Sequence, residues 1–146
     1  MKTRFACLLV LVASPLAAGD ADRGAIEAVV REAYVEGVHA RPDAAAMRRG
    51  FHADFRMLAL RDGKLSAVTL DEWASRIEKA AAERKPDAPA PQVRADITSV
   101  DVTGDAAVVR LELHRNGRHA FTDYLSLYRF PEGWRIVGKT FQAHRP

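Results

Sequence analysis

The segment FTDYLSL, residues 121–127, places an acidic side chain among residues typical of a strand core. Phe121, Leu125 and Leu127 share strand parity with Asp123, so the four side chains are expected on one face. A carboxyl group in a mostly apolar cavity loses hydration, which raises its pKa toward working pH and suits it to act as a general base. A carboxylate with a permanent cationic partner instead stays ionised and has a structural role.

The segment WRIVGKTF, residues 134–141, contains Lys139, and the position of this lysine decides which of the two roles Asp123 has. If the preceding turn pairs Phe130 with Trp134, Phe141 lies opposite Asp123 and Lys139 lies diagonal to it on the same face. Diagonal neighbours on adjacent strands are within reach of a long side chain. We therefore expect a structural Asp123–Lys139 pair and keep a ligand-contacting Asp123 as the alternative.

Other side chains could also take part in chemistry. His52 could shuttle protons near neutral pH, although histidines in such positions more often cap a helix or bond a loop, and His39 is a similar, weaker candidate. Tyr34 and Trp73 lie on apolar helix stripes, where core packing is the default and lining a cavity is compatible with it.

Motifs for metals and cofactors are not found. No two histidines have the i, i+4 spacing of a helical zinc site, and no acid completes a triad by local spacing, so we expect no metal site. The GxSxG, P-loop and GxGxxG signatures are absent, and we expect no cofactor. Five arginines are interleaved with acids and lack a track of stacking aromatics, so we expect them on a solvated face and expect no nucleic-acid binding; they are Arg41, Arg48, Arg49, Arg56 and Arg61.

Residues 1–21 have the pattern of a secretory signal peptide. Lys2 and Arg4 precede a short apolar run, small residues follow, and the segment is too short to span a membrane. Cleavage after Gly19 or after Ala21 fits equally well. We expect a periplasmic or secreted protein, with residues 22–146 as one domain and no stable membrane anchor after cleavage.

Removal of this leader changes the composition of the chain. With cleavage after Gly19, the net charge of +3 becomes about +1, from 20 basic and 19 acidic residues, so the high pI is weak evidence for nucleic acid. The single cysteine, Cys7, is also lost, which excludes a disulfide and thiol catalysis. An exported protein without disulfides fits a bacterial periplasm.

The order of elements predicts an α+β domain. Apolar spacing predicts a helix from about Arg23 to His39, Asp43 can cap a second short helix, and the Thr69/Glu72 capping box begins a third. Period-two patterns with Asp-Gly and Asn-Gly turns then predict an antiparallel meander, bent by a β-bulge within residues 93–102. The result is a cone-shaped domain with three N-terminal helices packed on a strongly bent, mostly antiparallel sheet.

Both faces of the last two strands are apolar. One face is expected to carry Phe121, Leu125, Leu127, Val137 and Phe141, and the other Tyr124, Tyr128, Phe130, Trp134 and Ile136. Helices can cover only one face, so the second needs a partner chain or exposes an aromatic patch. We predict a homodimer through the sheet face.

This arrangement resembles the nuclear transport factor 2-like superfamily, which includes the SnoaL-like proteins, and especially its putative lumazine-binding subgroup. The resemblance rests on YVEGVHARPDAAAMRRGFHADFRM, DGKLSAVTLDEW, VTGDAAVVRLEL and FTDYLSLYRFPEGWRIVGKTF. It implies a cone with an apolar pocket whose few polar groups do any chemistry. The residues it would place at the pocket are Tyr34, His39, His52, Phe55, Trp73, Asp123, Lys139 and Phe141.

Three functions are compatible with the resemblance. The first is an exported protein that binds a small apolar or aromatic ligand. The second is an acid–base enzyme of the isomerase or dehydratase type, because isomerase and cyclase members use a pocket acid as general base, with Asp123, His52 and Tyr34 as the candidates here. The third is a dimerisation or protein-interaction module that uses the aromatic sheet face.

Overall fold

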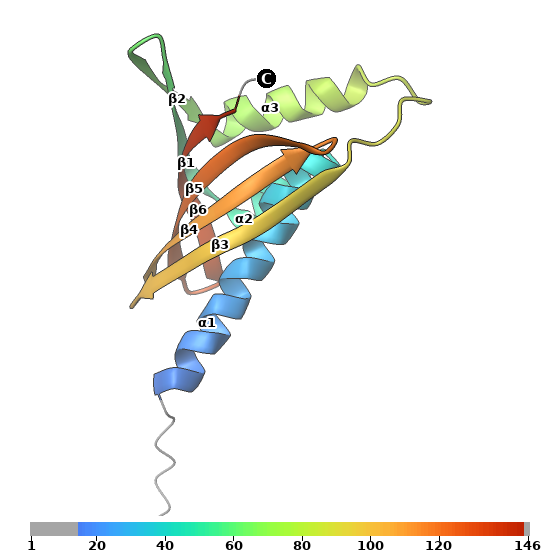
Figure 1. The fold of residues 1–146 in the computed structure, drawn as a ribbon. Helices are drawn as coiled ribbons and strands as arrows, with labels where there is room; N and C mark the ends of the chain where they lie inside the picture. The colour runs from blue at the N-terminus through green and yellow to red at the C-terminus, as the bar shows by residue number, and fades with distance from the viewer. Residues whose placement is uncertain (1–14, 145–146) are drawn as a thin grey trace, which may run out of the picture.

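The computed structural model describes residues 15–144 and contains a helical layer against a curled sheet (Figure 1). The helical elements are α1 (Pro15–Val29), η1 (Val30–Ala40), α2 (Ala44–Gly50) and α3 (Leu70–Ala82). Helix α1 runs directly into η1, so three helical rods cover the sheet. The predicted leader lies outside the described residues up to position 14, and its remaining residues belong to the start of α1.

The sheet has six strands in the order β2-β1-β6-β5-β4-β3. Their bounds are β1 (Phe51–Arg61), β2 (Lys64–Thr69), β3 (Val93–Thr103), β4 (Ala106–Arg115), β5 (Arg118–Phe130) and β6 (Gly133–Ala143). All neighbouring strands are antiparallel except β1 and β6, which are parallel. The predicted α+β architecture, with three helices on a bent and mostly antiparallel sheet, is therefore confirmed.

Local sequence signals explain most of the turns. Asp62 and Gly63 have φ values of 49° and 73°, and Asn116 and Gly117 have 51° and 76°, as a type I′ hairpin requires. The Thr69 capping box forms as predicted. The β3–β4 register shifts between residues 97 and 99, where the sequence predicted a bulge.

The first helix differs from its prediction in two ways. It begins at Pro15 rather than near Arg23, which is compatible with the tolerance of proline in the first helical turn. Its second part, η1, is a π-helix, in which Arg41 N donates to Glu36 O at 2.8 Å across five residues. Hydrophobic spacing alone had indicated an ordinary α-helix.

The predicted split of the last two strands into faces was partly wrong. Phe130 pairs with Gly133 rather than Trp134, and a register shift leaves Val137 as an extra residue between the Leu127–Ile136 and Ser126–Gly138 pairs. Such a bulge reverses strand parity. As a result, Trp134 and Ile136 lie in the core, while Tyr124 and Tyr128 remain exposed on the outer face.

The core fills the space between the helices and the inner face of the sheet. It joins the buried side of η1 to inward residues of β4, β5 and β6, including Val109, Leu111, Leu125 and Ile136. In residues 15–144, no helix is both long and apolar enough to cross a membrane.

Candidate functional site

A buried network of three polar side chains joins η1 to the two strands β5 and β6. The Tyr34 hydroxyl donates to Asp123 Oδ2 at 2.6 Å, and Lys139 Nζ donates to the Tyr34 oxygen at 2.8 Å. Lys139 Nζ also forms an ion pair with Asp123 Oδ1. Asp123 and Tyr34 are fully buried and Lys139 is 6% exposed, so this ion pair is shielded from water.

Strand register explains how Asp123 meets Lys139. Asp123 lies opposite Phe141 and Leu125 lies opposite Lys139, which makes Asp123 and Lys139 diagonal neighbours on the inner face. The sequence predicted this diagonal relation, but it predicted a different turn between the two strands. The bulge at Val137 compensates for the tighter Phe130–Gly133 closure, so the register beyond it matches the prediction.

Burial shifts the pKa values of two side chains in this network, Tyr34 and Lys139. Loss of hydration, followed by the Asp123 charge and hydrogen bond, raises the pKa of the Tyr34 hydroxyl well above its usual range. The pKa of Lys139 is lowered to about 8, because burial outweighs the opposing attraction of Asp123. The Tyr34 hydroxyl is therefore a fixed hydrogen-bond donor, whereas Lys139 can change protonation just above neutral pH.

The π-helix places His39 beside the same network. In an α-helix, residues five apart point about 140° away from each other, but the wider π turn brings Tyr34 and His39 into edge-to-face contact at 4.8 Å. Burial, with smaller contributions from Lys139 and Arg115, lowers the pKa of His39 to about 3. His39 Nε2 is buried and has no hydrogen-bond partner among the described residues, so a neutral ring presents a polar nitrogen here.

A cavity of about 350 Å³ opens above Lys139. Its size falls in the range of small-molecule pockets, about 300–1,000 Å³. The wall comes from η1 and the loop after it, from α3, and from β1, β4, β5 and β6. Its residues are Tyr34, Val38, His39, Pro42, Met57, Arg61, Trp73, Ile77, Ala80, Arg115, Phe121, Lys139 and Phe141. A neighbouring groove of about 830 Å³ shares Arg61, Phe121 and Phe141 with it.

The charged side chains among these described wall residues are all basic. Lys139 lies inside, 4.8 Å from the ring centroids of both Tyr34 and Phe141, and Arg61 and Arg115 complete the set. Because Asp123 is covered by Lys139 and does not belong to the wall, its negative charge compensates Lys139 from behind. The arrangement can hold a flat apolar body against aromatic rings and direct an acidic group toward cations.

Seven of the eight predicted site residues lie in the cavity wall or directly beneath it. Tyr34, His39, Trp73, Lys139 and Phe141 line the cavity, while Asp123 supports it from the layer below. Phe55 is fully buried and stacks on Trp73 at 5.7 Å, so it contributes to the pocket floor indirectly.

His52 lies outside the cavity. It stacks on Phe130 at 4.6 Å and accepts a hydrogen bond from Asp54 N at 3.1 Å, so it does not join Asp123 or Tyr34. Sequence reasoning did not identify Arg115, and it assigned Arg61 to a solvated face. Both arginines end a strand just before an Asp-Gly or Asn-Gly turn, which is the signal that could have placed them at one rim.

Comparison with known proteins agrees with this geometry. Residues 21–142 match the family described as putative lumazine-binding. A nuclear transport factor 2-like protein of unknown function from Silicibacter pomeroyi is 27% identical, with 86% of this chain and 98% of that chain covered and a TM-score of 0.69. A similar protein of unknown function from Shewanella baltica is 24% identical, with 87% and 97% covered and a TM-score of 0.72.

A more distant structure carries the name of an enzyme. It is a putative ketosteroid isomerase from Shewanella frigidimarina, 19% identical, with 81% of this chain and 94% of that chain covered and a TM-score of 0.59. The comparison with curated proteins found no match. The chain therefore belongs to the putative lumazine-binding family and has the nuclear transport factor 2-like fold, whose curled sheet and helices enclose the cavity.

Proposed function

We propose that this protein binds a small aromatic or apolar molecule that carries an acidic group. The observation that carries the proposal is the cavity above Lys139, where aromatic walls combine with described charges that are all positive. Membership of a family with a ligand-binding fold supports it. The family name identifies no ligand, so the ligand class is inferred from the cavity.

The buried network fixes the orientation of the Lys139 ammonium group. Within the described chain, two of its three N–H donors are directed to Asp123 and Tyr34, which leaves one for a ligand. A lysine with a pKa of about 8 is mostly protonated at neutral pH, and an anion beside it would favour the charged form further. A ligand carboxylate or sulfonate would therefore gain a charge-assisted hydrogen bond in a water-poor site.

A matched pair of fluorescent probes tests both parts of the proposal. We expect 1-anilinonaphthalene-8-sulfonate to bind the purified protein at one site and N-phenyl-1-naphthylamine, which has the same rings without the sulfonate, to bind about tenfold or more weakly, a difference of about 1.4 kcal/mol. Binding is followed by probe fluorescence and confirmed by isothermal titration calorimetry.

Two tryptophan substitutions on α3 locate the site. Ala80 lines the cavity and Ala81 does not, although both side chains are exposed on the same helix. Ala80→Trp should block the mouth and abolish the single site, whereas Ala81→Trp should bind as the unchanged protein does. Equal binding of both variants, or equal binding of the two probes, would contradict the proposal.

Acid–base catalysis is a second candidate, favoured by one observation. Lys139 lies in the cavity wall, and burial brings its pKa to about 8, close enough to neutral pH for proton transfer. The similarity to a structure named as an isomerase supports a test of this chemistry. A general base at Asp123 receives less support, because Lys139 and Tyr34 occupy its carboxylate.

Steroid isomerisation can be assayed directly with 5-androstene-3,17-dione by the ultraviolet absorbance of its conjugated product. A rate above background in the unchanged protein, lost in Lys139→Met and Asp123→Asn, would support catalysis. If turnover is unchanged in both Lys139→Met and Asp123→Asn, neither side chain of the pair acts as an essential acid or base.

We also propose export and a homodimer. The charged start, apolar run and small residues of positions 1–21 support export, which N-terminal sequencing of protein from a periplasmic fraction would test. Tyr124 and Tyr128, which are 43% and 53% exposed on the outer sheet face, support a partner surface for a second copy. Sedimentation velocity distinguishes a dimer from a monomer.

A further inference from the structure

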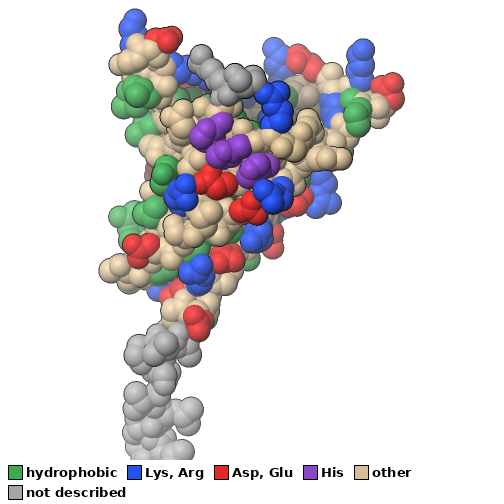
Figure 2. All heavy atoms as spheres, viewed as in Figure 1, with side chains coloured by type: hydrophobic (Ala, Val, Ile, Leu, Met, Phe, Trp, Pro, Cys, Tyr) green, Lys and Arg blue, Asp and Glu red, His purple; other side chains and the backbone are tan. Residues whose placement is uncertain are grey.

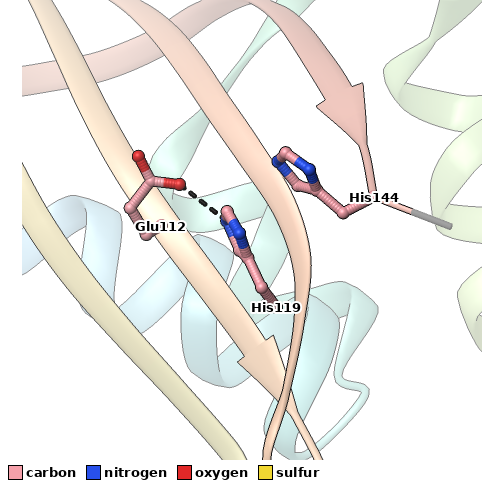
Figure 3. Close-up of side chains that lie close together, drawn as sticks. All are labelled: Glu112, His119 and His144. Carbon is pink, nitrogen blue, oxygen red and sulfur yellow. Dashed lines mark hydrogen bonds and ion pairs between the residues drawn. The ribbon is translucent and has the colours of Figure 1, made fainter. Parts of the chain in front are cut away.

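Three potential metal ligands from three neighbouring strands meet on the outer face of the sheet (Figure 3). Glu112 comes from β4, His119 from the start of β5, and His144 follows the end of β6. One donor atom from each, a carboxylate oxygen or an imidazole nitrogen, lies within 4.8 Å of the other two. Figure 2 shows histidine side chains gathered at the surface on this face, beside acidic and basic ones.

Strand pairing holds these three residues together. Glu112 lies opposite Thr122, His119 opposite His114, and His144 N donates to Ala120 O at 2.9 Å beyond the last strand pair. The His119 and His144 rings stack with centroids 3.9 Å apart, so their edges can serve one centre. The ligands are separated by 7 and 25 positions in the chain, which is why a search for local histidine spacing predicted no metal site.

The donor atoms converge on a single hydroxyl group. Thr122 Oγ1 lies 2.6 Å from Glu112 Oε2, 2.9 Å from His144 Nε2 and 3.4 Å from His119 Nε2. His119 Nε2 also lies 2.7 Å from Glu112 Oε2. Ligands bound to zinc at about 2.0–2.1 Å in a tetrahedron lie about 3.3 Å apart. Small side-chain rotations would therefore open a place for an ion between these atoms.

We propose that Glu112, His119 and His144 form a binding site for a divalent transition metal ion, with Zn²⁺ as the best match. Two imidazole nitrogens and one carboxylate oxygen are ligands that Zn²⁺ accepts, and three protein ligands leave a position for water. Arg110 pairs with the other carboxylate oxygen of Glu112, Oε1, and so orients Oε2 toward the histidines.

The same atoms could serve only as a hydrogen-bond network, and this is the alternative to be tested. The site is reachable from solvent, since the His119 and Glu112 side chains are 37% and 17% exposed. A bound ion would join the end of β6 to β4 and β5, so it would stabilise the folded protein by mass action. If the three residues form only a hydrogen-bond network, the stability of the folded protein would not depend on the metal concentration.

Calorimetric titration with Zn²⁺, on protein purified without a histidine tag and stripped with chelator, tests the site. We expect one ion per chain, with affinity lowered about tenfold or more in Glu112→Gln, His119→Gln and His144→Gln. His114→Gln is the matched control, because that ring stacks on His119 at 4.9 Å but is outside the donor set. Co²⁺ in place of Zn²⁺ should give visible absorption bands that show its coordination geometry.

Thermal unfolding supplies a second measurement that is independent of calorimetry. Zn²⁺ should raise the Tm of the unchanged protein and of His114→Gln by the same amount, and at the same concentration should raise the Tm of His144→Gln by less. Absence of one-site binding to the unchanged protein overturns the proposal in favour of the hydrogen-bond network. Binding that persists unaltered in all three ligand variants also overturns it, since the ion would then lie elsewhere.

Discussion

Replacing Lys139 by methionine leaves Asp123 as a fully buried carboxylate whose remaining described side-chain partner is the Tyr34 hydroxyl. Removing one partner of a buried ion pair typically costs about 3–5 kcal/mol. The carboxyl can avoid a buried charge by taking up a proton, which costs about 1.4 kcal/mol for each pH unit above its ordinary value of about 3.9. At pH 7 this route limits the loss to about 4 kcal/mol, so we expect Lys139→Met to lose about 3–4 kcal/mol of unfolding free energy.

The pH dependence of this loss follows from the same reasoning. In Lys139→Met the folded state holds a proton that the unfolded state releases above about pH 4, so acidification favours the folded variant. The difference in unfolding free energy between the variant and the unchanged protein should therefore shrink by up to about 1.4 kcal/mol per unit as pH falls from 7 toward 4. A difference that grows on acidification would show that this reasoning is wrong.

Two further variants separate the charge from the packing. Asp123→Leu/Lys139→Met removes both charges but leaves the buried Tyr34 hydroxyl without these partners, a cost of about 1–3 kcal/mol. Adding Tyr34→Phe removes that group as well, and the triple variant should return to within about 1–2 kcal/mol of the unchanged protein. Urea unfolding followed by fluorescence of Trp73 and Trp134 measures all four proteins. A triple variant as unstable as Lys139→Met would refute the assignment of the loss to an unpaired charge.

Three other predictions follow from particular contacts. Gly50→Ala should lose about 1–3 kcal/mol in urea unfolding, because the added Cβ collides with Ala33 Cβ. Gly24→Ala, in open space on α1, should instead gain up to about 1 kcal/mol, and a loss there would question the helix. The pKa of His39 falls from 6.5 unfolded to about 3 folded, so its contribution to stability is present above about pH 6.5 and is lost toward pH 3. Urea unfolding across this range should show a slope of up to about 1.4 kcal/mol per pH unit that His39→Phe lacks, and identical curves would count against the buried neutral ring. Tyr128→Glu should weaken the proposed dimer at least about tenfold in sedimentation equilibrium, whereas Leu65→Glu on the exposed β2 should not.

Several features of the fold could be predicted because they depend on neighbours in the sequence. The Asp62-Gly63 and Asn116-Gly117 turns require positive φ, and the Thr69 capping box satisfies its own helix end. Strand parity gave the diagonal relation between Asp123 and Lys139, because two residues on one face of a hairpin keep their relation when the register is right.

Other features depended on tertiary structure. The bulge at Val137 directs the side chains of Trp134 and Ile136 toward the core. No local sequence pattern distinguishes such a bulge from a longer turn at this place. The π-helical turn that brings Tyr34 into contact with His39 could not be predicted either. The spacing of apolar residues is the same for a wide apolar face on an α-helix and for a change to π-helical pitch.

By itself, the sequence determined the α+β class of the domain, the capped start of α3 and the two hairpin turns. It also identified Lys139 as the cation that pairs with Asp123. Only the tertiary structure decided which groups are accessible: Asp123 lies beneath Lys139, His52 lies outside the cavity, and Arg61 and Arg115 reach one cavity wall. It alone brought Glu112, His119 and His144 together. The physical reason is that periodicity fixes the face of an element that each residue occupies, whereas accessibility and convergence depend on how distant elements curve and pack.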